Sequence, residues 1–215
     1  MSATFAIAYY STYEHVYKLA QAVKRGADRV PNVDAQLYQI PETLPQDVLD
    51  KMHAPPKPAN VPQFTPDVLT KVDGTLFGIP TRFGMMPAQL KAFFDSTGGQ
   101  WAQGALRGKL AGTFFSTNTQ HGGQESTAYV TLPFFAHHGM TYVPFGSGHP
   151  AVTSTREVIG GGFWGAGTVA GGDDVRPSPL ELEIAEAQGE QFARAIWAHK
   201  RGEQELALLE KARAQ

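Results

Sequence analysis

Five short apolar segments recur along the chain, and each is typical of a strand buried in a sheet. The first reads TFAIAYY and is almost entirely apolar or aromatic over residues 4–10, as expected of a strand covered on both faces. Segments of similar character follow at residues 33–40, 74–80, 108–117 and 140–145. The pattern therefore predicts five strands.

Helical periodicity lies between and after these segments. Apolar residues spaced i, i+3, i+4, i+7 follow the first strand, and two further amphipathic patterns occupy residues 86–97 and 180–200. The apolar faces consist of Val16, Leu19, Ala20 and Val23; Leu90, Phe93 and Phe94; and Ala185, Phe192 and Ile196. Strands alternating with such helices predict an α/β fold, a doubly wound five-stranded parallel sheet with helices on both faces.

Two segments do not fit a minimal unit of this kind. Residues 41–66 contain seven of the fifteen prolines, and residues 146–172 contain nine of the twenty-three glycines. Both compositions disfavour long regular structure, and loops of such length in a compact domain are usually functional. We therefore predict one domain over residues 1–215, elaborated by these two loops.

Composition excludes several classes of function. A formal charge of −2 and scattered basic residues provide no surface for a nucleic-acid backbone. The chain has no cysteine, which removes disulfides and thiolate chemistry, and no metal-ligand cluster is evident. No stretch approaches 18 apolar residues and no signal-peptide pattern opens the sequence, so a cytoplasmic protein without membrane insertion is expected.

Polar residues follow three of the predicted strands. The sequences STYEHV (11–16), PTRFGM (80–85) and STNTQHGG (116–123) come directly after the first, third and fourth strands. In an open parallel sheet, ligands bind outside the carboxyl ends of the strands. Hydroxyls at the start of a helix suit a phosphate, so these loops form the candidate binding site, although each alone is also compatible with ordinary helix capping.

At this level of detail the sequence resembles a known family. YYSTYEHV, the block from Pro80 to Trp101, AHHGM and GAGTVAGGDDVRPSPLELEIAEAQGE are similar to the tryptophan-repressor-binding-protein-like NAD(P)H:quinone oxidoreductases, which have a flavodoxin-like fold. The resemblance implies noncovalently bound FMN, reduction of quinones by NADH or NADPH, and a homotetramer whose sites are completed across subunit contacts.

The resemblance also implies roles for individual residues. The FMN phosphate would lie on the loop of Ser11, Thr12, Tyr13, Glu14, His15 and Val16. The isoalloxazine would be lined by Thr81, Arg82 and Phe83, edged by Ser116, Thr117, Asn118, Thr119 and Gln120, and contacted by His137. The catalytic set would be Tyr13 facing the nicotinamide, Trp101 covering the substrate from a neighbouring subunit, and His137.

This chain departs from the family pattern at three places. Glu14 replaces a glycine, Met85 replaces an asparagine, and NTQHGG replaces a glycine-rich run. At ~6 Å and an effective dielectric near 20, the repulsion between Glu14 and each phosphate charge would be about 3 kcal/mol. The alternative is that Glu14 points outward and stabilises its own helix.

Three functions are therefore open from the sequence. The leading interpretation is an FMN-dependent quinone reductase. The alternatives are a flavodoxin-like electron carrier, which would favour a more acidic surface, and a noncatalytic interaction protein with weakened FMN binding.

Overall fold

One twisted sheet runs through the described chain, and its strand order is the one that a doubly wound fold requires. The computed structural model describes residues 2–172 and 175–213. Its elements are β1 (Ala3–Tyr9), α1 (His15–Ala27), β2 (Val33–Gln39), α2 (Gln46–Lys51), α3 (Pro66–Lys71), β3 (Gly74–Pro80), α4 (Ala88–Asp95), α5 (Gly98–Ala102), β4 (Leu110–Thr117), α6 (Gln124–His138), β5 (Thr141–Tyr142), η1 (Pro150–Thr153), β6 (Gly160–Gly162), β7 (Gly165–Val169) and α7 (Pro179–Arg213). The strand order is β2-β1-β3-β4-β7-β6. Since β2 and β3 flank β1 in parallel, the order reverses at β1, and a ligand is expected there.

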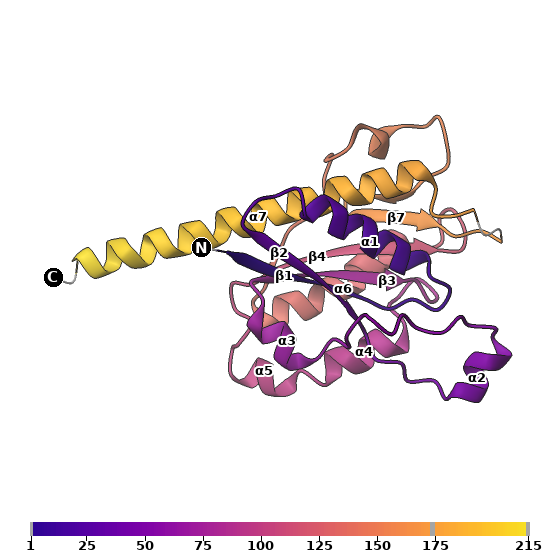
Figure 1. Ribbon diagram of the computed structural model, residues 1–215, viewed down its shortest axis with the longest axis horizontal. Helices are drawn as coiled ribbons and strands as arrows, with labels where there is room; N and C mark the ends of the chain where they lie inside the picture. Colours follow the sequence, from indigo (N-terminus) through magenta and orange to yellow (C-terminus); the bar gives the residue numbers. More distant parts are fainter. Residues whose placement is uncertain (1, 173–174, 214–215) are drawn as a thin grey trace.

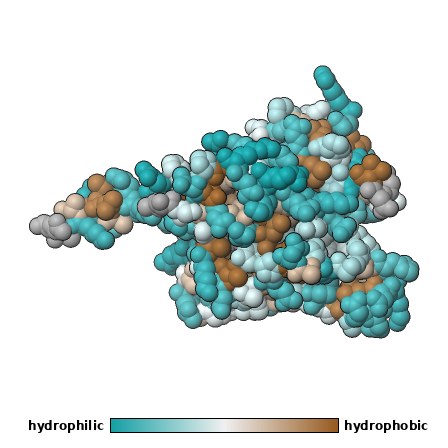
Figure 2. Space-filling view, viewed as in Figure 1, coloured by the Kyte–Doolittle hydropathy of each residue, from teal (hydrophilic) through white to brown (hydrophobic). Residues whose placement is uncertain are grey.

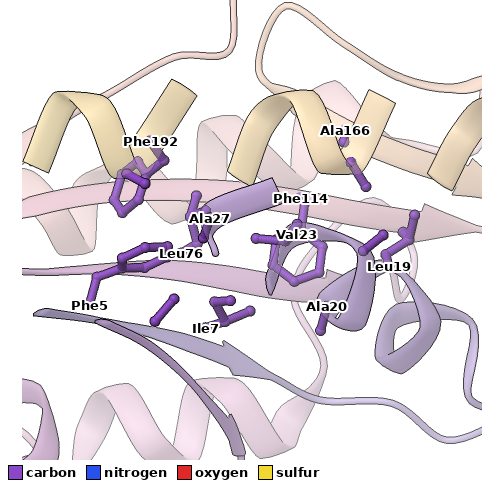
Figure 3. Close-up of a cluster of buried hydrophobic side chains, with 14 of the residues drawn as sticks. Phe5, Ile7, Leu19, Ala20, Val23, Ala27, Leu76, Phe114, Ala166 and Phe192 are labelled. Carbon is purple, nitrogen blue, oxygen red and sulfur yellow. The ribbon is translucent and has the colours of Figure 1, made fainter. Parts of the chain in front are cut away.

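Helices cover both faces of the sheet (Figure 1), as the sequence predicts. On one face, α1 and α7 enclose a cluster of buried side chains that includes Phe5, Ile7, Leu19, Phe114 and Phe192 (Figure 3). On the other face, α3, α4 and α6 pack over a second cluster rich in phenylalanine. The strands β3 and β4 are buried along their whole length, which explains their almost unbroken apolar sequence.

The fifth position of the sheet differs from the prediction. The prediction of a single strand over residues 140–145 was wrong, because only Thr141–Tyr142 form a strand, β5, which pairs with the start of β4. Pro144 has no N–H with which to extend the ladder, and the chain leaves the sheet there. It returns as β7, which pairs in parallel with the end of β4, while β6 adds an antiparallel edge. Two short strands therefore share the fifth position.

The helix α7 extends well past the body of the molecule (Figure 1). Its buried residues end at Ile196, and Figure 2 shows the remaining turns standing clear, with a hydrophobic patch on them. Leu206, Leu208 and Leu209 are exposed on this arm. Among residues 2–172 and 175–213, no helix has the length and apolar character needed to cross a bilayer.

Candidate FMN and nicotinamide site

A cleft of about 760 Å³ opens where β1, β3 and β4 end. The three loops that the sequence selects converge on it, together with parts of the proline-rich and glycine-rich segments. The cleft is lined by Ser11, Thr12, Tyr13, Glu14, His15, Val16, Lys18, Met52, His53, Pro55, Pro80, Thr81, Arg82, Ser116, Thr117, Asn118, Ala170, Gly171 and Gly172.

The turn after β1 forms one end of this cleft. Ser11 and Thr12 are buried, while Tyr13 and Glu14 are exposed. Glu14 is the N-cap of α1 and has a left-handed backbone with φ of 64°, and its side chain makes no capping hydrogen bond. Two hydroxyl groups beside the positive end of a helix dipole attract an anion. The turn is therefore suited to a phosphate group.

Arg82 brings a positive charge from the β3 loop to the same turn. Its Nη2 donates to Thr12 Oγ1 over 3.1 Å, and no carboxylate of the described residues lies within ion-pairing distance of it. The guanidinium is therefore available to a negatively charged ligand. Phe83 has φ of 52° and is 99% exposed, so it lies outside the cleft wall.

The end of β4 and the loop after it form the opposite edge of the cleft. Ser116 and Thr117 are buried, and backbone hydrogen bonds from the glycine-rich segment hold the loop: Ala170 N donates to Thr117 O over 2.7 Å and Gly171 N to Asn118 O over 2.9 Å. Thr119, Gln120 and His121 line an adjoining hollow of about 530 Å³ instead. The predicted stretch 116–120 is thus divided between two hollows.

The proline-rich segment supplies a wall of the cleft that the sequence did not assign. Met52, His53 and Pro55 line the cleft, and Tyr13 Oη donates to Met52 O over 3.0 Å. The density of prolines in residues 41–66 was the signal that this loop has a role. The particular residues could not be chosen, because they reach the cleft through contacts distant in sequence.

Two predicted catalytic residues lie elsewhere in the chain. His137 is exposed near the end of α6, a 15-residue helix, and lies about 20 Å along the helix axis from its first residue. Trp101 is 57% exposed on α5. Trp101 and His137 lie in the same region, because the residues beside them are hydrogen-bonded. Thr97 Oγ1 and His138 Nε2 are 3.0 Å apart, and Trp101 N donates to Thr97 O. A single chain thus leaves both residues outside its own cleft.

Comparison with known proteins decides the family. The model of NADPH-dependent FMN reductases matches residues 14–149. The chain belongs to this family. The relatives include NAD(P)H quinone oxidoreductase PST2 of Candida albicans, 53% identical over 91% of this chain and 96% of that protein, and quinone-oxidoreductase QR2 of Triphysaria versicolor, 55% identical over 90% and 95%.

Solved structures of flavodoxin-like proteins match the architecture of this chain. A WrbA-like flavodoxin from Agrobacterium tumefaciens superposes with a TM-score of 0.62 at 21% identity, over 92% of this chain and 99% of that one. Flavodoxin 1 from Bacillus cereus superposes with a TM-score of 0.55 at 14% identity, over 89% and 98%. The flavodoxin-like fold and the family resemblance predicted from the sequence are confirmed.

The residues present fit FMN. A cleft of about 760 Å³ is in the range that holds cofactors. Its lining combines the hydroxyls and helix N-terminus of the β1 turn with Thr81 and Asn118 from the ends of β3 and β4. A flat ring with an anionic tail needs both an anion site and polar groups for the ring edge. The charge of Glu14 opposes the fit.

Proposed function

We propose that this chain, as one flavodoxin-like domain in the cytoplasm, catalyses the FMN-dependent two-electron reduction of quinones by NADH or NADPH. The observation that carries the proposal is the cleft at the ends of β1, β3 and β4, in a chain more than 50% identical to named quinone oxidoreductases over nine tenths of its length. The absence of cysteine agrees with electron transfer by a bound cofactor rather than by thiols.

FMN and the protein have different roles in the proposed reaction. When bound, FMN supplies the hydride and electron chemistry that amino-acid side chains lack. Ser11 and Thr12 bind its phosphate, and Arg82 holds the β3 loop against the phosphate turn through Thr12. The hydrogen-bonded loops on both sides hold the walls of the cleft in place, which orients stacked reactants for transfer.

The catalytic set requires more than one chain. Tyr13 lines the cleft, where it faces the nicotinamide, and its hydroxyl is fixed by Met52. Trp101 and His137 are exposed on a different part of the surface. In the proposed homotetramer, these residues reach the cleft of a neighbouring subunit, where Trp101 covers the quinone and His137 contacts the flavin ring.

The decisive experiment is the visible spectrum of the purified protein followed by a turnover assay. We expect absorption near ~450 nm from bound flavin, and oxidation of NADH or NADPH that depends on added benzoquinone. A yellow protein that does not oxidise either nicotinamide would indicate the electron carrier. A protein that stays colourless after incubation with FMN would indicate the noncatalytic interaction protein.

A further inference from the structure

A small cavity adjoins the phosphate turn and shares part of its lining with the cleft. It measures about 10 Å³ and is lined in part by Ser11, Thr12 and Glu14, which also line the cleft. Of these two hollows, Lys57 lines the smaller one and Arg82 lines the cleft. The turn therefore borders both hollows, and a basic side chain lines each of them.

Lys57 makes a specific contact with the turn. Its Nζ donates to the backbone carbonyl of Ser11, lies 4.7 Å from the centre of the Tyr10 ring and 3.4 Å from Glu42 Oε2. Burial lowers the pKa of Lys57, and the charge of Glu42 opposes that shift. The side chain is only 30% exposed, so it is a built part of the turn rather than a surface lysine.

Glu42 is itself fixed in place. Its carboxylate accepts hydrogen bonds from Tyr10 Oη and Gln89 Nε2, each over 2.9 Å. Burial raises the pKa of Tyr10 to about 12, so the hydroxyl keeps its proton and continues to donate. Burial would also raise the pKa of Glu42, but hydrogen bonds from Leu44 N, Tyr10 and Gln89 outweigh it and leave the pKa below its usual value. The result is a rigid carboxylate that orients Lys57.

The planarity of the peptide bond transmits this contact to the cleft. In a trans peptide, the carbonyl of one residue and the N–H of the next point in opposite directions. The carbonyl of Ser11 accepts from Lys57, so the N–H of Thr12, a residue that lines the cleft, points away from Lys57. No acceptor in residues 2–172 or 175–213 takes up this N–H.

We propose that Lys57 is a positioning residue that fixes the peptide between Ser11 and Thr12, so that the Thr12 N–H donates to the phosphate of FMN. This inference rests on the proposed binding of FMN in the cleft. The lysine acts through the carbonyl and does not touch the ligand. Removing it frees the peptide to rotate and presents a carbonyl oxygen to the phosphate in part of the molecules.

The test compares two flavins that differ only in the phosphate. Dissociation constants for FMN and riboflavin are measured by quenching of flavin fluorescence for the wild type, Lys57→Met and Lys57→Arg. We expect Lys57→Met to weaken FMN binding about tenfold, the effect of losing one charge-assisted phosphate contact. Riboflavin binding should change less than about twofold, and Lys57→Arg should restore most of the FMN affinity.

Lys109 provides a matched control. It also donates from a partly buried Nζ to a backbone carbonyl, Val72 O at 2.6 Å, and burial also lowers its pKa, but it lies at the opposite end of the sheet, just before β4. Lys109→Met should leave the ratio of FMN to riboflavin affinity unchanged. Thermal unfolding without flavin measures the general cost of each change.

Each outcome decides the proposal. Equal weakening of FMN and riboflavin in Lys57→Met, or no change in either, overturns it, since a purely structural lysine would not select the phosphate. If Lys57→Met does not fold, Lys57→Gln is judged by the same ratio. A wild type that binds neither flavin overturns the proposed function itself. If the wild type binds FMN but Lys57→Met has the same ratio of FMN to riboflavin affinity, only the role of Lys57 is overturned.

Discussion

Glu14 has a backbone conformation that its residue type disfavours. A left-handed conformation costs a residue with a Cβ atom about 1–2 kcal/mol, and glycine adopts it freely. Glu14 has φ of 64° at the position where the sequence resemblance places glycine. The backbone therefore keeps the shape of the family turn, while the side chain adds both strain and a negative charge to the wall of the cleft.

Two substitutions separate the strain from the charge. Glu14→Gly should raise the free energy of unfolding of the flavin-free protein by about 1 kcal/mol, and Glu14→Gln should leave it nearly unchanged because it keeps the strain. Both should strengthen FMN binding by about tenfold. A repulsion of about 3 kcal/mol would correspond to roughly a hundredfold, but Glu14 is exposed and solvent screens its charge.

Urea unfolding and FMN titration at low and high salt measure these effects. If the charge dominates, the advantage of Glu14→Gln shrinks as salt rises. Tight FMN binding by the wild type that neither substitution changes would show that Glu14 points into water and has no bearing on the phosphate.

Residues of the cleft could be predicted where they stand next to a strand end. Ser11 and Thr81 come just after β1 and β3, and Ser116 lies at the end of β4, and a parallel sheet brings such positions together whatever the details of the loops. Met52 could not be predicted, because its contact with Tyr13 spans 39 residues within a segment that has no periodicity. Lys57 was missed for the same reason.

At the scale of elements, α1 and α7 approach so closely that backbone touches backbone. A Cβ atom on Gly26 would lie 1.8 Å from Glu186 O, and one on Gly189 would lie 1.9 Å from Val23 O. Gly189 lies in the interior of α7, where alanine is intrinsically better by about 1 kcal/mol, and Gly26 lies in the last turn of α1. Close packing of the two helices, rather than any turn, therefore explains these glycines.

Glycines of α7 should respond in opposite ways to alanine. Gly189→Ala should lower the free energy of unfolding by about 3 kcal/mol or more, because α7 must shift away from α1 and open the core. Gly202, on the projecting part of α7, has no atom within 4 Å of an added Cβ, so Gly202→Ala should raise stability by up to about 1 kcal/mol. Chemical unfolding measures both, and equal effects would contradict the close contact.

Asp73 joins the amino end of the sheet to α7. It accepts hydrogen bonds from Thr4 N over 2.8 Å and from Lys200 Nζ over 2.7 Å. Burial would raise the pKa of Asp73, but the hydrogen bonds from Lys200 and Thr4 outweigh it and lower the pKa below its usual value. The folded protein therefore favours the carboxylate.

Linkage gives the direction of the pH effect. A lowered folded pKa contributes stability above the unfolded value of about 3.9, and that stability is lost as the pH falls through the folded pKa. Asp73→Asn should cost about 1–2 kcal/mol at pH 7, with the difference shrinking below pH ~4. Asp95→Asn, which breaks only the exposed pair with Lys91, should cost less than about 0.5 kcal/mol at any pH.

Strands buried on both faces were the most predictable elements, because their apolar runs have few other interpretations. The divided fifth position was not predictable from its apolar character. Residues 140–145 have the apolar character of one strand, but Pro144 has no N–H to donate to a neighbouring strand. The sequence of β7 is GAGTV, and its glycines do not indicate a buried strand. There the pairing with β4 determines the structure more than local propensity.

At the scale of the whole molecule, the cleft and two of the predicted catalytic residues lie on different parts of one chain. Tyr13 lines the cleft, whereas Trp101 and His137 are exposed near the far end of α6. Exposed aromatic side chains of this kind are enriched at protein interfaces. The proposed homotetramer would bring these residues to the cleft of a neighbouring chain, and a closed dihedral tetramer would do so for every copy.

Mixed assemblies test this arrangement directly. Tyr13→Ala and Trp101→Ala should each lower quinone reduction per bound flavin, because each removes one part of the site. If the two residues act from different chains, co-expressing the variants in equal amounts regenerates sites that have both side chains. These should be about one quarter of all sites, since each chain contributes the intact residue with a probability of about one half.

If Tyr13 and Trp101 of the same chain acted together, no mixed assembly would contain an intact site, and the co-expressed protein would be no more active than the separate variants. Light scattering at micromolar concentration supplies the second measurement, with the mass of a tetramer expected. A monomeric mass accompanied by full activity would show that one chain suffices. If one chain suffices, dilution should leave the activity per bound flavin constant. If the site is shared between chains, dilution should lower this activity as the subunits separate.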